Sequence, residues 1–201
     1  MQKQDTKDDI ELESIDLAKS FLAGDRRSFD RLIMLHKRLV FNLCYRSLGD
    51  YDEADDCAQD VFIKVSRSLK DFRFGSRFTT WLYRITVNTC KNRIGSLEYR
   101  LRSRTVRIDT ERDMDDKPKV LEIENHRHTP VVEFAKKEID HLIQCAVNTL
   151  PAKQRLVVVL RDIEGRSYKE IGEIMGFELG TVKSTLSRAR EQLRELLKGK
   201  I

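Results

Sequence analysis

The chain has 201 residues, of which 35% are charged and 7% aromatic, and its formal net charge is +5 at pH 7. Few aromatic residues and only three prolines favour helices over sheets, and the length allows one domain or two small ones. The N-terminus is polar, and no run approaches the roughly 20 apolar residues of a membrane-spanning helix. We therefore expect a cytoplasmic protein without membrane insertion, whose mild positive charge allows a nucleic-acid partner without requiring one.

The first predicted domain, residues 13–97, is a set of helices. Apolar residues recur at helical spacing from residue 29 to residue 44, and Gly49 is expected to end that helix. Asp50 or Asp52 is expected to cap the next helix, because acidic groups favour a helix N-terminus. One face of that next helix is apolar. The opposite face is polar and acidic, as is typical of a solvated surface, and comprises Asp56, Gln59, Asp60 and Lys64.

Aromatic and basic residues alternate within residues 72–92, on either side of a glycine. This pattern is typical of a surface for single-stranded nucleic acid, because bases stack on rings while cations hold the backbone. The rings are expected to be too many for one small core; they are Phe72, Phe74, Phe78, Trp81 and Tyr83. The alternative is that Phe78, Trp81 and Leu82 are core residues and that only the loop is exposed.

Residues 98–132 are predicted to form a flexible linker between two domains. Charged residues are frequent there, apolar residues are few, and Pro118 and Pro130 interrupt any long helix. Arginines cluster near the start of this linker, and two roles are open for them: phosphate contacts with nucleic acid, or simple solvation. The cluster comprises Arg100, Arg102, Arg104 and Arg107.

The cysteines and histidines give no sign of catalysis or metal binding. The cysteines are scattered along the sequence without a CxxC pair, so we expect reduced, half-buried thiols. They are Cys44, Cys57, Cys90 and Cys145. His126 and His128 lie in a polar stretch and are expected to be solvated. The sequence predicts no catalytic site, no metal site and no cofactor, because it contains no nucleophile–base pair, phosphate loop or metal-ligand cluster.

The second predicted domain, residues 133–201, also consists of helices. An apolar stripe over residues 139–150 predicts its first helix. Pro151 fits the first turn of the next helix, and Gly165 is expected to end it. A helix-turn-helix then follows.

This helix-turn-helix is predicted over residues 166–197. Ser167 and Glu170 form a capping-box pattern, and Gly176 suits the turn between the two helices. The second helix is apolar along Val182, Leu186, Ala189 and Leu193, and the opposite side carries small, polar and basic residues that suit a DNA groove. Thr181, Arg190 and Arg194 are expected to reach phosphates. Such a motif places its second helix in the major groove of DNA; the alternative is a solvated amphipathic hairpin.

Over residues 16–197, the chain resembles the bacterial sigma factors of the extracytoplasmic-function group. The resemblance is carried by the order and spacing of DEADDCAQDVFIKV, FRFGSRFTTWLYRITVNTCKN, LPAKQRLVVVLRDIEGRSYKEIGEIMG and GTVKSTLSRAR. It implies an all-α fold of two small helical bundle domains, sigma regions 2 and 4, joined by a flexible linker. It also implies an alternative sigma factor that binds promoter DNA and core RNA polymerase, contacting the largest and second-largest subunits. An anti-sigma factor would control it, and catalysis would belong to the core enzyme.

The resemblance further implies three sets of site residues. The core-binding set would bind a coiled coil on the largest polymerase subunit and comprises Asp56, Gln59, Asp60 and Phe62. The minus-ten set would melt and read the minus-ten element on the non-template strand and comprises Phe72, Arg73, Phe74, Gly75, Trp81 and Asn88. The minus-thirty-five set would read the minus-thirty-five element as duplex and comprises Gly180, Thr181, Lys183, Ser184, Ser187 and Arg188.

Two departures from the family pattern leave the exact promoter sequence open. Lys183 stands where relatives often carry arginine, and a lysine loses the planar bidentate grip. The loop reads Phe-Gly-Ser-Arg where many relatives have a glycine followed by an acidic residue.

Two other functions remain possible at this point. The first is a conventional helix-turn-helix regulator that binds duplex DNA as a dimer without polymerase, against which the aromatic–basic segment and the acidic helix argue. The second is an adaptor that binds proteins only and has no affinity for DNA.

Overall fold

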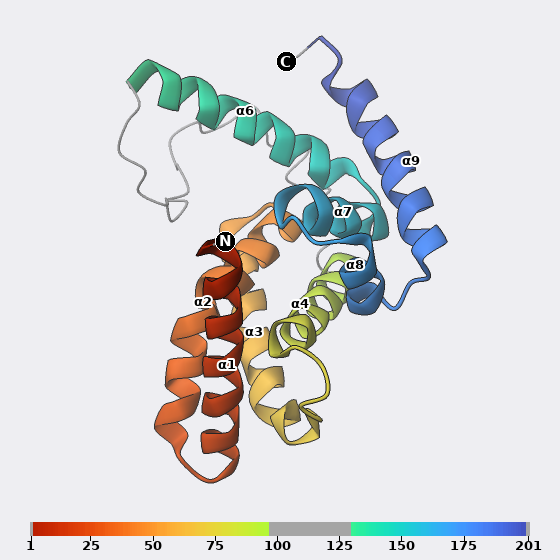
Figure 1. Cartoon of the computed structure of the whole chain (residues 1–201). Coiled ribbons are helices and arrows are strands. Elements are labelled where there is room, and N and C mark those ends of the chain that lie inside the picture. Colours follow the sequence, from red (N-terminus) through yellow and green to blue (C-terminus); the bar gives the residue numbers. More distant parts are fainter. Residues whose placement is uncertain (1, 97–129, 200–201) are drawn as a thin grey trace.

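The computed structural model describes residues 2–96 and 130–199, which contain helices and no strand. The first bundle consists of α1 (Gln2–Leu22), α2 (Arg26–Leu48), α3 (Tyr51–Ser68), the short 3₁₀ helix η1 (Leu69–Asp71) and α4 (Phe78–Gly95). The second consists of α6 (Pro130–Thr149), α7 (Ala152–Val158), η2 (Val159–Ile163), α8 (Tyr168–Met175) and α9 (Leu179–Leu197). In Figure 1 the first bundle lies below the second.

The predicted linker lies almost wholly outside the described residues, and so do its arginine cluster and the two histidines at positions 126 and 128. The second bundle begins with α6 at Pro130, three residues ahead of the predicted boundary. A proline is well tolerated in the first turn of a helix, since its missing N–H would have no helical partner there. None of the described helices has the length and apolar character needed to cross a membrane.

The ends of α2 and α3 follow local rules. Gly49 ends α2 in the left-handed conformation, at φ 79°. The carboxylate of Asp50 accepts the backbone N–H of Glu53 at 2.8 Å and so caps α3. The structure therefore confirms the predicted break at Gly49 and chooses Asp50 over Asp52 as the cap.

The first helix contributes more to the first bundle than the sequence predicted. Glu11, which lies before the predicted domain start at residue 13, is buried, and its carboxylate accepts the backbone N–H groups of Phe78 and Thr79. It also accepts the Thr79 hydroxyl at 2.8 Å. Since α4 has no side-chain cap of its own, a residue of α1 serves as its cap and fixes the start of α4 against α1.

Most of the aromatic rings of residues 72–83 enter the core and one stays at the surface, as in the alternative that leaves only the loop exposed. Phe72, Phe78 and Tyr83 are buried and Trp81 is half-buried, while Phe74 remains 37% exposed. The Phe72 ring meets the Phe78 ring edge to face at 5.6 Å and lies 5.1 Å from the Trp81 ring. Tilted and edge-to-face rings share a small volume without steric conflict, so the core holds most of them.

The cysteines are not scattered in space. Cys44, Cys57 and Cys90 are fully buried and meet in the core of the first bundle, whereas Cys145 is exposed. The three buried cysteines come from three different helices, α2, α3 and α4 respectively. The expectation of half-buried, separate thiols is therefore wrong for these three.

The second bundle has the helix ends that its sequence predicted, with one shift. Ser167 and Glu170 form the capping box of α8, and Gly176 ends α8 at φ 67°. Pro151 occupies the N-cap of α7 instead of its first turn. After Val158, α7 continues into η2, a π-helical turn, and the backbone then turns at Gly165, at φ 66°.

Candidate polymerase and nucleic-acid interfaces

The core-binding set lies along α3. Asp56, Gln59 and Asp60 are exposed, and Phe62 is half-buried and packs against the hydrophobic core. The structure adds Arg93 of α4, whose guanidinium contacts three carboxylates of α3. The distances are 2.6 Å to Glu53, 3.1 Å to Asp56 and 3.5 Å to Asp60. The acidic face is therefore partly neutralised and tied to α4.

Sequence reasoning missed Arg93 because its partners lie 33 to 40 positions earlier in the chain. The spacing of Glu53, Asp56 and Asp60 does place three carboxylates on one face of a helix. Nothing in that spacing indicates which basic residue lies opposite.

The minus-ten set is divided between a loop and α4. Arg73, Phe74 and Gly75 are exposed in the loop, while Phe72 is only 4% exposed beneath them. The Phe74 backbone has φ 53°, a left-handed conformation that non-glycine residues rarely adopt. Its ring meets the Phe72 ring edge to face at 4.9 Å. Packing onto the buried ring therefore helps to hold Phe74 in this unusual conformation at the surface.

The remaining minus-ten residues share a face of α4. Trp81 is half-buried and Asn88 is exposed, and a spacing of seven residues places both on one side of the helix. Arg84 is exposed between them, and the sequence analysis did not select it. Trp81 and Arg84 line a small pocket together with Glu173 of α8. The second bundle thus borders the minus-ten face.

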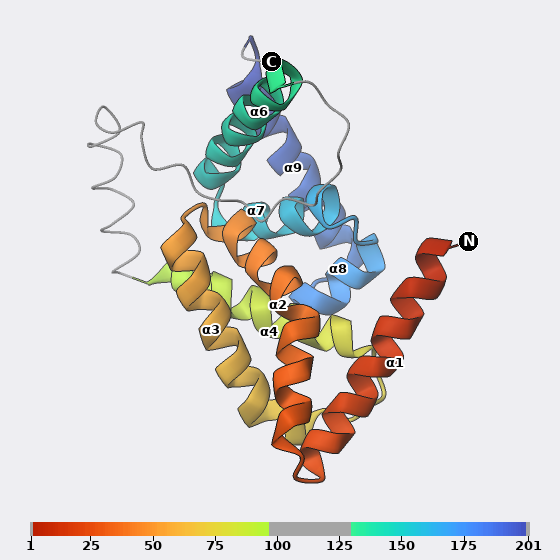
Figure 2. The same cartoon turned by 90° about the vertical axis from the view of Figure 1, so that its left-hand side faces the viewer.

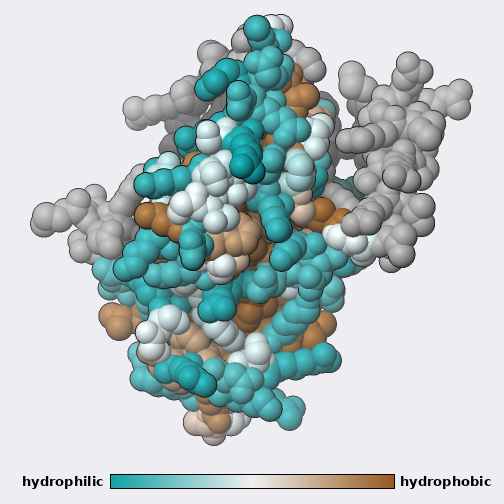
Figure 3. Space-filling view, turned by 90° about the vertical axis from the view of Figure 1, so that its right-hand side faces the viewer, coloured by the Kyte–Doolittle hydropathy of each residue, from teal (hydrophilic) through white to brown (hydrophobic). Residues whose placement is uncertain are grey.

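The minus-thirty-five set is gathered on α9. All six of its residues are exposed, while Val182, Leu186 and Ala189 are buried on the opposite side of the helix. Lys183 and Ser187 line a shallow hollow with Tyr168 of α8, which the sequence analysis also missed. Figure 3 shows the molecular face turned toward the right of Figure 1, which is mostly hydrophilic with scattered hydrophobic patches.

Arg190 pairs with a carboxylate of its own chain. Its Nε lies 3.2 Å from Oδ2 of Asp162, and its Nη2 also contacts the same carboxylate. This ion pair joins α9 to η2. Arg194 and Thr181 are exposed, and the phosphate contacts expected of these residues stay predictions.

The two bundles contact each other through α4, α7 and α8 (Figure 2). The Tyr83 hydroxyl of α4 donates to Glu164 at 2.7 Å and accepts from Arg166 at 2.9 Å. The Arg166 guanidinium also stacks over the Tyr83 ring, 4.3 Å from its centroid. Burial, followed by the Glu164 charge, raises the pKa of Tyr83, so the hydroxyl keeps its proton and can donate.

A second group of contacts lies near the end of α2. Arg155 of α7 donates to the Ser47 carbonyl at 3.0 Å, and the Gln144 amide of α6 donates to the Arg46 carbonyl at 3.1 Å. A Cβ at Gly49 would lie 1.8 Å from the Asn148 amide nitrogen. The sequence analysis explained Gly49 only as the residue that ends a helix. The close approach of α6 is a second reason for a glycine at this position.

Both halves of the chain match models of one protein family. Residues 32–98 match the model of Sigma-70 region 2, and residues 140–193 match the model of Sigma-70, region 4. The first match covers most of α2 and all of α3 and α4, and the second covers most of α6 to α9. Each bundle therefore corresponds to one conserved sigma region.

Relatives of known family match most of the chain. The RNA polymerase sigma-H factor of Pseudomonas aeruginosa is 34% identical over 174 residues, which are 87% of this chain and 88% of the relative. The ECF RNA polymerase sigma factor SigW of Bacillus subtilis is 34% identical over 181 residues, which are 90% and 94% of the two chains.

Solved structures share the same architecture. CnrH in complex with the cytosolic domain of CnrY has a TM-score of 0.61 at 23% identity and covers 95% of this chain and 98% of that chain. The sigma factor RpoE in complex with the anti-sigma factor NepR from Bartonella quintana has a TM-score of 0.59 at 25% identity, covering 87% and 99%. The predicted all-α fold class is confirmed.

These matches also decide between the functions that the sequence left open. A conventional regulator and a protein-only adaptor each account for at most part of the chain, whereas the sigma models account for both bundles. The chain belongs to the extracytoplasmic-function family of RNA polymerase sigma factors, the specificity subunits that direct transcription initiation.

Proposed function

We propose that this chain is an alternative sigma factor that acts in the cytoplasm, binds core RNA polymerase through the core-binding set and reads two promoter elements. The minus-thirty-five element is read as duplex by α9, and the minus-ten element as a melted non-template strand by the minus-ten set. The complete exposure of the minus-thirty-five set on one helix is the observation that carries this proposal.

The exposed side of α9 suits the major groove. Its small residues, Gly180 and Ser184, allow close approach to the bases, and Arg188 has the planar donors that guanine edges accept in pairs. Lys183 supplies a single charged donor. Since the opposite side of α9 packs on the core of the second bundle, the helix is held rigidly for this contact.

The loop after η1 suits an unstacked base. The exposed Phe74 ring offers a stacking surface, and the exposed Arg73 offers charge for the backbone. Stacking on one ring contributes about 1–3 kcal/mol per base, which is comparable to the few kcal/mol that extruding a base requires. Backbone strain at an exposed aromatic residue is a frequent mark of a binding loop, and Phe74 has both features.

Contact between the bundles implies a closed form that polymerase must open. Glu173 of α8 lines the pocket beside Trp81 and Arg84, so the second bundle borders the surface proposed to bind the melted strand. The RpoE–NepR structure contains a related sigma factor with its anti-sigma factor. We extend this to the present chain and propose that an anti-sigma protein holds the closed form.

The test uses the full chain and purified core polymerase on a library of bacterial promoter fragments. Together they should produce discrete transcripts that neither component produces alone, with permanganate-reactive thymines at the minus-ten element. If the mixture forms no joint particle and opens no DNA, the proposal is wrong. If the chain instead binds a duplex site tightly without polymerase, the result favours a conventional helix-turn-helix regulator.

A further inference from the structure

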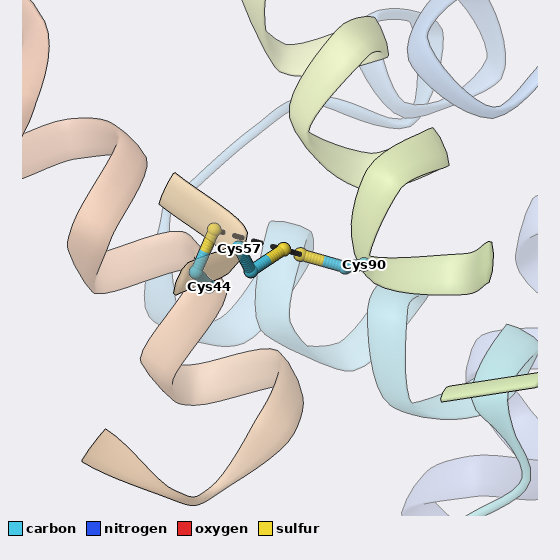
Figure 4. Close-up of side chains that lie close together, drawn as sticks. All are labelled: Cys44, Cys57 and Cys90. Carbon is cyan, nitrogen blue, oxygen red and sulfur yellow. Dashed lines mark hydrogen bonds between the residues drawn. The ribbon is translucent and has the colours of Figure 1, made fainter. Parts of the chain in front are cut away.

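Three thiols converge at one point in the core of the first bundle, as Figure 4 shows. The sulfur atoms of Cys57 and Cys90 are 3.8 Å apart, and so are those of Cys90 and Cys44. All three sulfur atoms lie within 4.8 Å of one another. No role in polymerase or promoter binding accounts for this arrangement, because all three side chains are fully buried.

The separations match those around a metal ion. Two of the three sulfur–sulfur distances are 3.8 Å and the third is at most 4.8 Å. The point in their plane that is equally far from all three therefore lies about 2.1–2.5 Å from each sulfur atom. A zinc–thiolate bond is about 2.3 Å long. We infer that Cys44, Cys57 and Cys90 bind one thiophilic divalent cation of the zinc and cadmium class through three thiolates.

The donor atoms decide the class of cation. Among the described residues, this cluster contains sulfur alone, without carboxylate or imidazole. Magnesium and calcium prefer oxygen ligands, whereas thiolates select soft ions. Binding breaks three S–H bonds and forms three metal–sulfur bonds, and the three protons leave to solvent without any change of oxidation state.

The surroundings favour a divalent ion. Three thiolates around a divalent cation leave one negative charge, and buried charge needs a partner. The Lys64 ammonium donates to the Thr89 hydroxyl at 3.1 Å, next to Cys90 in the sequence, and so brings a positive charge near the cluster. A cation held here would join α2, α3 and α4 directly behind the acidic face of α3.

A disulfide explains the cluster less well. It requires two sulfur atoms about 2.05 Å apart and leaves a third without a role. Here three helices contribute one thiol each, and the three are similarly spaced. Complete burial also protects thiols from oxidants, because oxidation follows exposure.

Titration of the reduced, metal-free full chain with cadmium chloride under argon tests the site. We expect one ion per chain, three protons released, and a thiolate-to-metal charge-transfer band in the ultraviolet. Because the three thiols meet only in the folded state, a free concentration 100-fold above Kd should raise Tm by about 5–11 °C. Zinc chloride should compete for the same site.

Single variants identify the ligands. Cys44→Ala, Cys57→Ala and Cys90→Ala should each weaken binding at least 100-fold, with folding checked by circular dichroism. The matched control is Cys145→Ser, which should bind as the parent does. This control is needed because the exposed Cys145 lies 3.8 Å from a nitrogen of His141 and offers a competing surface site. Loss of binding in Cys145→Ser alone would overturn the inference.

A measurement on the unaltered chain covers the case in which a variant fails to fold. X-ray absorption at the cadmium edge should show a first shell dominated by three sulfur atoms. A shell of oxygen and nitrogen, or mass spectrometry that finds a disulfide among the three cysteines and no bound ion, would contradict the proposal. Failure of this site leaves the proposed promoter recognition untouched, because the transcription assay is read separately.

Discussion

On α9 every residue of the minus-thirty-five set is exposed, whereas the minus-ten set combines an exposed loop with the buried Phe72 and the half-buried Trp81. One surface is the outer side of a helix whose inner side forms the core. In the minus-ten set, the same cluster of rings both packs in the core and holds the exposed loop in place. Changes on α9 should therefore affect DNA recognition alone, while changes in the minus-ten set should affect folding as well.

The largest effect is expected at Phe72. Phe72→Ala removes a buried ring that contacts Phe78 and Trp81, and should destabilise the chain by about 3–5 kcal/mol in urea unfolding. Phe74→Ala is the matched control, since its ring is 37% exposed and its loss should cost under about 1 kcal/mol. Phe74→Ala should nevertheless reduce open-complex formation. Equal losses of stability in the two variants would contradict the contrast between a buried ring that stabilises the loop and an exposed ring that contacts DNA.

The first bundle should also be sensitive to acid. His36 is 2% exposed and hydrogen-bonded to the Ser14 hydroxyl at 2.8 Å, and burial lowers its pKa from 6.5 to about 4. Below pH 6.5 the unfolded chain therefore binds a proton that the folded chain excludes. Stability should fall by about 2 kcal/mol between pH 7 and pH 5 from this residue.

The measurement is urea unfolding over that pH range in the parent and in His36→Gln. The variant should be less stable than the parent at pH 7. Its free energy of unfolding should fall less between pH 7 and pH 5, by about 2 kcal/mol, which is the amount that His36 contributes in the parent. Parallel slopes would show that His36 is not the group responsible.

Recognition through α9 is expected to be separable from stability. Arg188→Ala should weaken binding of the holoenzyme to the minus-thirty-five element by about 1.5 kcal/mol, roughly tenfold, because a base contact is lost. Unfolding should change by under about 0.5 kcal/mol, since the side chain is exposed. Arg38→Ala, at an exposed position of α2, is the control. Equal binding of cognate and scrambled elements by the parent would contradict this placement.

Charge reversal on α3 should weaken assembly with polymerase. Asp60→Arg removes a carboxylate 3.5 Å from Arg93 and places a second cation beside it. We expect core affinity to fall by about 1 kcal/mol, roughly fivefold, in a competition binding assay. Asp30→Arg makes the same charge change at an exposed position of α2. Unchanged assembly of Asp60→Arg would refute this part of the core-binding set.

An effect of similar size is expected at the contact between the two bundles. Tyr83→Phe keeps the ring under Arg166 but removes the hydroxyl that bonds Glu164 and Arg166. The closed form should lose about 1 kcal/mol, which small-angle scattering would detect as a larger radius of gyration. Tyr51→Phe, at an exposed tyrosine of α3, should leave the scattering unchanged.

Local features of the fold were predictable from sequence. The Asp50 cap, the Ser167–Glu170 capping box and the glycine ends of α2 and α8 each depend on residues within a few positions of one another. The apolar spacing of α3 and α9 likewise fixed which side of each helix is buried. Because such rules act within one or two turns of a helix, a single sequence reveals them.

Contacts between distant segments were decided by the tertiary structure alone. Glu11 caps a helix that begins 67 positions later, Arg93 pairs with carboxylates 33 or more positions away, and Tyr83 bonds Glu164 at a separation of 81. The cysteine cluster is of the same kind, since each thiol comes from a different helix. Helical periodicity defines the buried side of a helix but not its partner, because many pairings bury similar apolar area. Only the packing of the helices therefore shows that the two bundles contact each other, that Arg93 pairs with the acidic face of α3 and that the three thiols meet.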